Sequence, residues 1–327
     1  MSPAIEKYLT LKDGRTLAYA DCGNLSSDKL VIFLHGAFGV GITDEEKIQP
    51  SLTEKGVHYV APTLPGWGKS SIRNHSIPYH LGFTSDIDQL IDHLHPTKNN
   101  LRIYLSGGSF GSVPAQLLYG APFDIFPNGR YVKGCMLLAP FSPFREDKEH
   151  GKEMTMSNYL FIGAPSQYLP FHLISRLAKA TISRQLGSPE QAEAFVRQNI
   201  FNKMDEEEKA TFAKWRADTG RKEGELEGDF GRNMHRSVQE TWDGFFDMPD
   251  ITNGDWGFKV TELDAEHCSD KRPVFIIAAE GDKMAPASMA KWLATNYRSA
   301  RLRMITGGHL SGIYSLNELW KEFLEMC

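Results

Sequence analysis

The chain has 327 residues, of which 41% are hydrophobic and 24% are charged, and its formal net charge is −5. This composition is that of a globular protein with a large core, and not of a disordered or fibrous chain. The acidic balance argues against nucleic acid as the main partner. The sequence also lacks an apolar run of about 18 residues, which argues against a membrane span.

The amino terminus and the cysteines bear on the cellular compartment. The first 23 residues lack the long apolar core of a signal peptide and instead predict a hairpin that turns at Asp13-Gly14. The cysteines have no paired spacing, so neither a disulfide framework nor a zinc site is indicated. They are Cys22, Cys135, Cys268 and Cys327. We therefore expect a cytoplasmic protein.

The first predicted parallel strands each end in a glycine-containing loop. Residues 29–34 form a continuous apolar run, the pattern of a strand covered on both faces, and lead into His-Gly-Ala-Phe-Gly at 35–39. The glycines there are spaced G-x-x-G-x-G, which does not match the G-x-G-x-x-G of a dinucleotide loop. A second strand at 57–61 leads into the proline- and glycine-rich loop 62–70.

A serine lies at the centre of the next strand–turn–helix unit. Residues 103–105 predict a short buried strand, and helix-like apolar spacing resumes at Val113. Between them Ser109 lies two residues from Gly107 and from Gly111, the G-x-S-x-G pattern of a nucleophile elbow. So sharp a turn leaves no room for side chains at the two glycines. The following helix N-terminus would point N–H groups at an oxyanion that forms beside the serine.

The remaining elements alternate between strands and helices. The predicted strands are 135–139, 274–279 and 302–305, and the predicted helices are 85–94, 288–296 and 316–326. Ser85 is the expected N-cap of the first of these helices. The alternation predicts an α/β protein whose mostly parallel central sheet is covered by helices on both faces.

The segment 144–258 differs from the rest of the chain. Strand-like apolar runs disappear, and charged residues alternate with aromatic ones at helical intervals, which predicts an inserted helical domain. The acidic run 205–208 is expected to be the solvated first turn of a helix. The aromatic residues are expected mainly in the core of the insertion; they are Tyr159, Phe161, Tyr168, Trp215, Trp242 and Trp256.

Three residues suited to nucleophilic catalysis follow the ends of three predicted strands: Ser109, Asp282 and His309. Because the carboxyl ends of parallel strands share one edge of a sheet, we expect these side chains to lie together. Asp264 and Glu280 remain alternatives for the acidic member, since both are close to Asp282 in sequence.

The histidines give little support for a metal site. The pairs His75/His80 and His93/His95 lack a carboxylate motif such as H-E-x-x-H, so we interpret them as surface residues. We expect neither a metal nor a cofactor.

Five motifs in this order resemble the α/β-hydrolase superfamily over nearly the whole chain. They are His-Gly at 35–36, Pro-Gly-Trp-Gly-Lys-Ser at 65–70, Gly-Gly-Ser-Phe-Gly at 107–111, Gly-Asp at 281–282 and Gly-His at 308–309. The resemblance implies an α/β-hydrolase core made of residues 1–143 and 259–327. Residues 144–258 would form the helical cap, or lid, that this family places over its site.

The resemblance also implies the roles of the site residues. Ser109 would be the nucleophile, His309 the general base and later the acid, and Asp282 the group that orients His309. The implied oxyanion hole consists of backbone N–H groups, those of Phe110 and Ala37, with Phe38 as the alternative to Ala37.

Some positions depart from close relatives. Thr63 stands where relatives carry Asp, and we expect a structural effect there. The serine motif is similar to that of the proline iminopeptidase branch, but the loop at 35–39 does not have that branch's His-Gly-Gly-Pro-Gly. A serine nucleophile also disfavours the epoxide-hydrolase and haloalkane-dehalogenase branches, which need an aspartyl ester.

The expected function is therefore a cofactor-independent serine hydrolase that cleaves a carboxylic ester or lactone of a medium-sized, largely apolar small molecule. Amide (aminopeptidase-like) or carbon–carbon bond cleavage on the same triad remains an alternative, as does a catalytically silent binding protein. We expect a monomer or homodimer, with chemistry supplied by the core and substrate choice by the cap.

Overall fold

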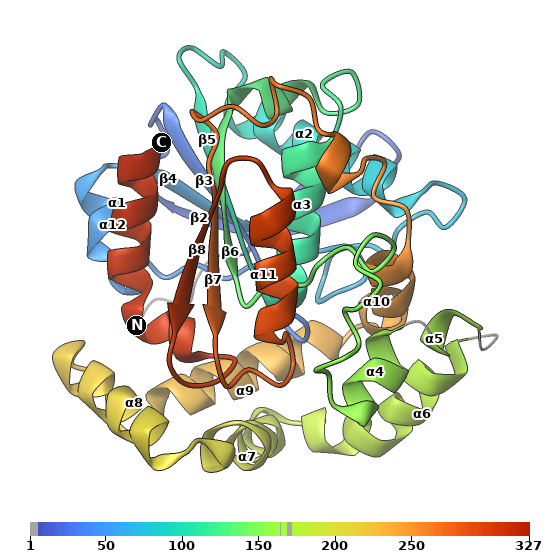
Figure 1. The fold of residues 1–327 in the computed structure, drawn as a ribbon, viewed down its shortest axis with the longest axis vertical. Coiled ribbons are helices and arrows are strands. Elements are labelled where there is room, and N and C mark those ends of the chain that lie inside the picture. The colour runs from blue at the N-terminus through green and yellow to red at the C-terminus, as the bar shows by residue number, and fades with distance from the viewer. Residues whose placement is uncertain (1–5, 164, 169–171) are drawn as a thin grey trace.

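An eight-stranded sheet crosses the molecule in the computed structural model, which describes residues 6–163, 165–168 and 172–327 (Figure 1). The strand order is β1-β2-β4-β3-β5-β6-β7-β8. Strand β1 (Lys7–Thr10) and strand β2 (Thr16–Gly23) form the predicted antiparallel hairpin, and β2 also pairs antiparallel with β4 (His58–Pro62).

The other strands are parallel to one another, as the apolar runs predict. They are β3 (Lys29–Leu34), β4, β5 (Arg102–Gly108), β6 (Val132–Leu138), β7 (Val274–Ala279) and β8 (Ala300–Ile305). Every residue of β7 is buried. A strand with both faces covered can accept apolar side chains at every position, which explains the continuous hydrophobic runs.

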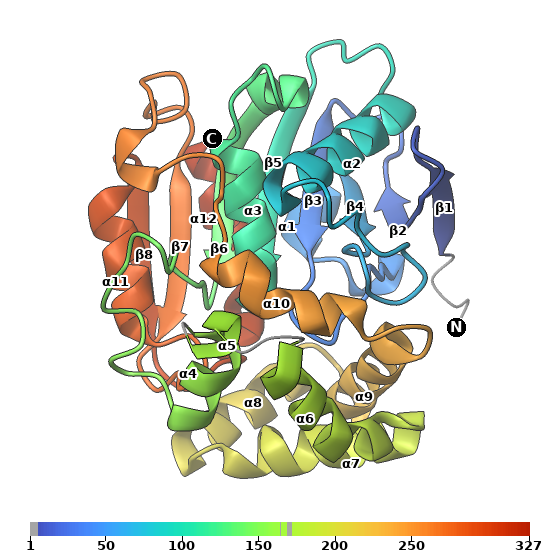
Figure 2. The same cartoon turned by 90° about the vertical axis from the view of Figure 1, so that its right-hand side faces the viewer.

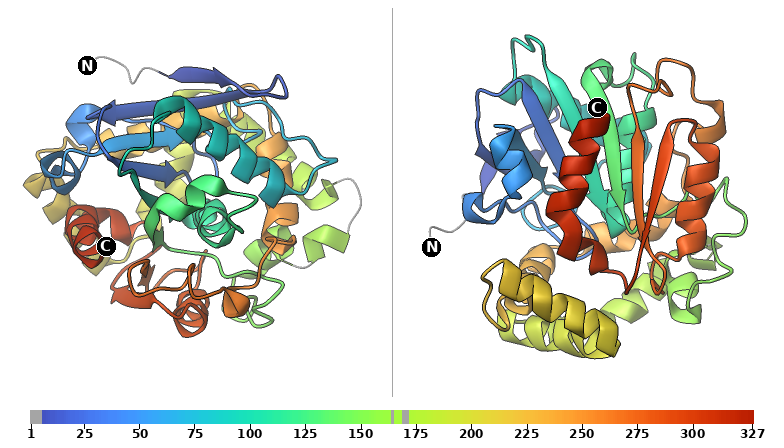
Figure 3. Two further views of the ribbon diagram at one scale, coloured as in Figure 1. Left: turned by 90° about the horizontal axis from the view of Figure 1, so that it is seen from above. Right: turned by 60° about the vertical axis from the view of Figure 1, so that its left-hand side comes forward.

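Helices cover both faces of the sheet (Figures 1 and 3). Successive residues of β7 illustrate the division, because Val274 and Ile276 join one apolar cluster whereas Phe275 and Ile277 join the other. The first face is covered by α2 (Tyr79–Leu94), α3 (Ser112–Gly120) and α11 (Ala287–Asn296). The second is covered by α1 (Pro50–Glu54) and α12 (Leu316–Met326).

Helix α2 begins earlier than the sequence predicts. It starts at Tyr79, with Pro78 at the N-cap position, so the prediction that Ser85 caps this helix is wrong. Proline presets the backbone angle for a helix start. The ring of Tyr79 then stacks on buried Phe83, 5.5 Å between centroids, which stabilises the additional turn.

The segment between β6 and β7 is helical. Its helices are α4 (Met156–Ile162), α5 (Pro165–Tyr168), α6 (Leu173–Ile182), α7 (Pro189–Asn199), α8 (Glu206–Asp218), α9 (Glu225–Val238) and α10 (Asp243–Asn253). In Figure 1 the arrowheads of β7 and β8 point toward the layer that contains α8 and α9, and Figure 2 shows helices α6–α9 gathered at that end of the sheet. This segment therefore lies over the carboxyl ends of the parallel strands. Among the described residues, no helix combines the length and the apolar content needed to cross a membrane.

The acidic run 205–208 is only partly solvated. Asp205 is the N-cap of α8 and accepts a hydrogen bond from the Glu208 N–H at 2.8 Å, which agrees with a helix start. Glu208 itself is buried, and its carboxylate contacts the Gly308 N–H beside His309. The expectation of a solvated turn is therefore wrong at Glu208.

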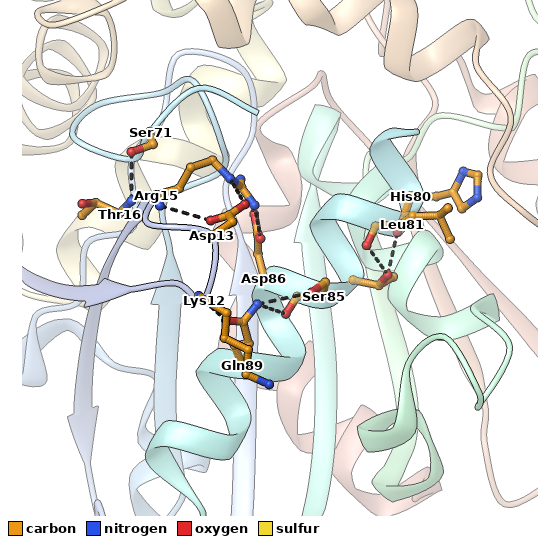
Figure 4. Close-up of polar contacts among 11 residues, drawn as sticks. Lys12, Asp13, Arg15, Thr16, Ser71, His80, Leu81, Ser85, Asp86 and Gln89 are labelled. Atoms are coloured by element: carbon orange, nitrogen blue, oxygen red, sulfur yellow. Dashed lines mark hydrogen bonds and ion pairs between the residues drawn. The ribbon is translucent and has the colours of Figure 1, made fainter. Parts of the chain in front are cut away.

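A bidentate ion pair ties the first hairpin to α2 (Figure 4). The guanidinium of Arg15 donates to both carboxylate oxygens of Asp86, at 2.8 and 2.5 Å, and also to exposed Asp13 at 2.7 Å. Asp86 is almost fully buried, and burial raises its pKa even though Arg15 opposes the shift. The two carboxylates thus share one arginine but differ in exposure.

This difference predicts unequal costs for the same substitution. Asp86→Asn removes a charged acceptor from a buried bidentate contact and should lower the free energy of unfolding by about 1–3 kcal/mol. Asp13→Asn at the exposed site should cost less than about 1 kcal/mol. Urea unfolding of both variants tests this, and equal losses would contradict it.

Candidate active site

Ser109 occupies a sharp turn between strand β5 and helix α3. The chain passes from Gly108 into a single 3₁₀ turn, Ser109–Gly111, that continues directly as α3. Ser109 has φ of +54°, a left-handed conformation that is strained for a residue with a side chain. A Cβ at Gly107 would lie 2.1 Å from the Gly111 carbonyl oxygen, and one at Gly111 would lie 2.1 Å from that of Leu34. Only glycine fits at both positions, for the reason inferred from the sequence.

The structure brings Ser109, His309 and Asp282 together. His309 Nε2 lies 2.8 Å from Ser109 Oγ, and His309 Nδ1 lies 2.7 Å from Asp282 Oδ2. When Nδ1 carries the proton and donates to Asp282, Nε2 is left to accept a hydrogen bond from the serine hydroxyl. A neutral histidine in this orientation can remove the serine proton.

Asp282 is held from its other side by the backbone that follows β7. Its Oδ1 accepts hydrogen bonds from the N–H groups of Met284 at 2.8 Å and Ala285 at 3.0 Å. The Asp282 side chain is fully buried, whereas that of His309 is 10% exposed and Ser109 is half-buried. The Asp282 carboxylate is thus shielded from water, while the serine and the histidine keep some exposure.

The alternative acids lie elsewhere. Asp264 Oδ1 is 2.8 Å from the Nδ1 atom of His267, a different histidine, and Glu280 is exposed at the end of β7. Neither is paired with His309 in the structure.

The histidine pairs considered as metal ligands are not arranged around a common point. His80 Nδ1 contacts the Asp255 carbonyl oxygen at 2.9 Å, and His75 is 3.8 Å from Asp247. His95 contacts His58 at 2.9 Å. Within the part of the chain that the structure describes, no group of three or more His, Cys, Asp or Glu side chains could hold a metal ion.

His35 fastens the loop that follows β3. Its Nδ1 lies 2.8 Å from the Gly36 carbonyl oxygen, and its Nε2 accepts the Leu64 N–H at 2.9 Å. Nδ1 therefore carries the proton and His35 is neutral; burial lowers its pKa to about 4. The sequence places this histidine in the His-Gly motif at 35–36 but does not predict a role for it. Its position directly after a buried strand was the available signal.

The loop 35–39 lies against the serine turn. A Cβ at Gly36 would be 3.3 Å from Ser109 Cβ and 3.2 Å from the Gly108 carbonyl oxygen. Ala37 is the residue directly after Gly36, the glycine that contacts the serine turn. Phe38 adopts φ of +55°, and its ring contacts Trp67 at 5.6 Å between centroids.

Thr63 holds the neighbouring loop. It is fully buried, its Oγ1 accepts the Gly41 N–H at 2.9 Å, and its own N–H donates to the Ala18 carbonyl oxygen. The first bond connects the segments after β3 and β4, and the second connects Thr63 to β2, which agrees with the structural effect expected for this residue.

Aromatic side chains from the helical segment adjoin the loop 35–39. The ring of Phe38 lies 5.0 Å from Phe245 and 6.2 Å from Trp242, at the start of α10. Phe161 of α4 stacks on Phe245 at 4.7 Å. Phe38, Phe161, Trp242 and Phe245 form what we call the aromatic wall.

The lowered pKa of His35 predicts an acid-sensitive contribution to stability. Between about pH 4 and its ordinary value of about 6.5, the unfolded chain binds a proton at this residue and the folded chain does not. The contribution is complete above about pH 6.5 and is lost as the pH falls toward 4, by roughly 3 kcal/mol. His35→Gln does not titrate, so its unfolding free energy should fall less steeply over this range. Denaturant unfolding at several pH values tests this, and parallel curves for parent and variant would contradict it.

Comparisons with known proteins agree on the fold. A hydrolase from Pseudomonas aeruginosa PA01 is 18% identical with a TM-score of 0.61, and an esterase from Exiguobacterium antarcticum is 18% identical with a TM-score of 0.56; each match covers 98% of both chains. An alpha/beta hydrolase fold protein from Chitinophaga pinensis is 17% identical over 98% of this chain and 96% of that one, with a TM-score of 0.57. No curated protein matches the chain in sequence. The model of the Alpha/beta hydrolase family matches residues 31–319, most of the chain, and the protein therefore belongs to the alpha/beta hydrolase family.

Proposed function

We propose that this protein is a cofactor-independent serine hydrolase that cleaves a carboxylic ester or lactone of a medium-sized, largely apolar molecule. The observation that carries the proposal is the continuous pair of contacts from Ser109 Oγ through His309 to Asp282, at 2.8 and 2.7 Å. A nucleophile, a base and a group that orients the base are what acyl transfer requires.

In the proposed first step, Ser109 Oγ attacks the ester carbonyl carbon while His309 Nε2 takes the hydroxyl proton. The imidazolium that forms is stabilised by the adjacent Asp282 carboxylate. His309 then gives the proton to the alcohol that leaves, so that an acyl group remains on Ser109. In the second step, His309 takes a proton from water, and the resulting attack releases the acid and restores the serine.

The oxyanion of each tetrahedral intermediate would be held by backbone N–H groups of Phe110 and Ala37, with Phe38 as the alternative to Ala37. Phe110 follows the nucleophile at the start of the helical turn, and the Gly36 contact with Ser109 supports a role for the loop 35–39. The positive end of the α3 dipole favours negative charge at the same place.

The aromatic wall supports an apolar substrate. Its rings come from both the loop 35–39 and the helical segment 144–258, which we propose to be the cap. We propose that these rings border the reaction centre, where they favour an apolar acyl or alcohol group and exclude water. Esterases among the similar structures accord with this proposal.

The nucleophile is tested by covalent labelling. Ser109→Ala should abolish reaction with a fluorophosphonate probe and hydrolysis of aryl esters, because the attacking oxygen is lost while folding is nearly unaffected. His309→Ala should lower kcat by a similar factor, and the double variant by no more, since the two residues act as a unit. Ser109→Ala activity within tenfold of the parent would overturn the mechanism.

The acid is tested by matched amides. Asp282→Asn should lower kcat by roughly 10³ to 10⁴, because the amide no longer stabilises the imidazolium and favours the wrong tautomer. Asp264→Asn serves as the control, since that carboxylate pairs with His267, and should leave kcat within about threefold. The reverse order of effects in steady-state kinetics would show that the acid is misassigned.

A further inference from the structure

The Gly307–Gly308 peptide group, one residue before His309, is hydrogen-bonded on both of its edges. The Gly307 carbonyl oxygen accepts the Gly281 N–H at 2.9 Å, which joins it to the loop that carries Asp282. On the opposite edge, the Gly308 N–H donates to Glu208 Oε1 at 3.1 Å. One edge of the peptide is therefore bonded to the loop that carries Asp282, and the other edge is bonded to helix α8 of the helical segment.

Ser311 strengthens the contact with Glu208. Its hydroxyl donates to Glu208 Oε1 at 2.6 Å, and its Oγ also accepts the Gly308 N–H at 2.8 Å. The backbones of these two residues are also hydrogen-bonded, because the Ser311 N–H donates to the Gly308 carbonyl oxygen at 3.1 Å. A single buried carboxylate oxygen thus receives two hydrogen bonds from residues on either side of His309.

The carboxylate lies directly against the two glycines. A Cβ at Gly308 would be 3.2 Å from Glu208 Oε2, and one at Gly307 would be 2.2 Å from Ser311 Oγ. Gly307 also has φ of +94°, a conformation that favours glycine. The Gly-Gly sequence before His309 therefore leaves room for a side chain contributed by another part of the chain.

Helix α8 presents one continuous face to the histidine segment. Glu208, Phe212 and Trp215 are spaced i, i+4 and i+7, so they share this face. The rings of Phe212 and Trp215 lie 5.5 and 5.6 Å from Tyr314, which follows His309 by five residues. Apolar packing and the buried carboxylate therefore dock α8 on both sides of the histidine.

We propose that Glu208 is a positioning residue for His309. Its carboxylate fixes the Gly307–Gly308 peptide, and through it the direction in which the imidazole meets Ser109 and Asp282. This inference rests on the proposed hydrolase function. It also modifies the expected division of labour, since a helix of the proposed cap then takes part in arranging the chemistry as well as in choosing the substrate.

The test replaces the acceptor while keeping length. Glu208→Met should lower kcat for a minimal aryl acetate by at least about tenfold with KM within about threefold, because a small displacement of the base slows the reaction without changing binding. Glu208→Gln should stay within about threefold of the parent, since its amide oxygen can accept the same two hydrogen bonds. Glu207→Met is the matched control, because Glu207 is exposed on the same helical turn.

A second variant keeps the proposal testable if Glu208→Met does not fold. Ser311→Ala removes one of the two donors to Glu208 together with the 2.8 Å acceptor of the Gly308 N–H, so it should also lower kcat. Thermal unfolding reports which variants are folded. A folded Glu208→Met protein with kcat within threefold of the parent overturns the proposal, as does a rise in KM alone. Should Glu208→Met fail to fold, an unchanged kcat for Ser311→Ala overturns it.

A spectroscopic measurement separates this proposal from the proposed function. The His309 Nδ1 proton that faces Asp282 should give a downfield ¹H NMR resonance, which Glu208→Met should shift or broaden and Glu207→Met should not. If the parent shows no hydrolysis yet this response is seen, the positioning role stands and the proposed function fails. If the parent hydrolyses esters but neither the resonance nor kcat responds, the positioning role fails.

Discussion

The arrangement of the site depends on the close passage of the chain around Ser109. Helix α3 can begin at the edge of the sheet only because Gly107 and Gly111 let its first turn lie against strand β5 and the end of β3. That passage forces Ser109 into the left-handed region, where its hydroxyl projects from the turn. The same geometry places a helix N-terminus beside the serine, so one steric constraint sets both the position of the Ser109 hydroxyl and the local electrostatic field.

The loops after three other strands carry the residues that surround Ser109. His309 follows β8, Asp282 follows β7, and His35 follows β3. The two histidines differ in surroundings and in state. His35 is buried and neutral with both ring nitrogens bonded to backbone, so it holds loops in place. His309 keeps partial exposure and faces the Ser109 hydroxyl, which suits the proton transfer that we propose for it.

The helical segment between β6 and β7 meets the core in two chemically different ways. At the start of α10 it offers aromatic rings that pack beside Phe38, a contact without strong directional preference. At the start of α8 it offers Glu208, whose hydrogen bonds are directional. The first kind of contact tolerates different apolar groups, whereas the second fixes a backbone segment. One helical segment thus combines apolar packing beside Phe38 with hydrogen bonds that fix the backbone next to His309.

The sequence by itself determined the elements whose signals are local. The apolar runs at 29–34 and 274–279 are the observed strands to the residue, because both faces of a parallel strand are buried and the runs end at polar or glycine residues. The glycine spacing around Ser109 likewise predicted the turn. The start of α2 at Tyr79 depended on packing against Phe83, which a cap at Ser85 did not foresee. The role of Glu208 could not be predicted from the acidic run, since a charged residue one hundred positions from Gly308 carries no local sign of its partner. Only the folded chain brings such groups together, because hydrogen bonds between distant segments depend on how helices and sheet pack.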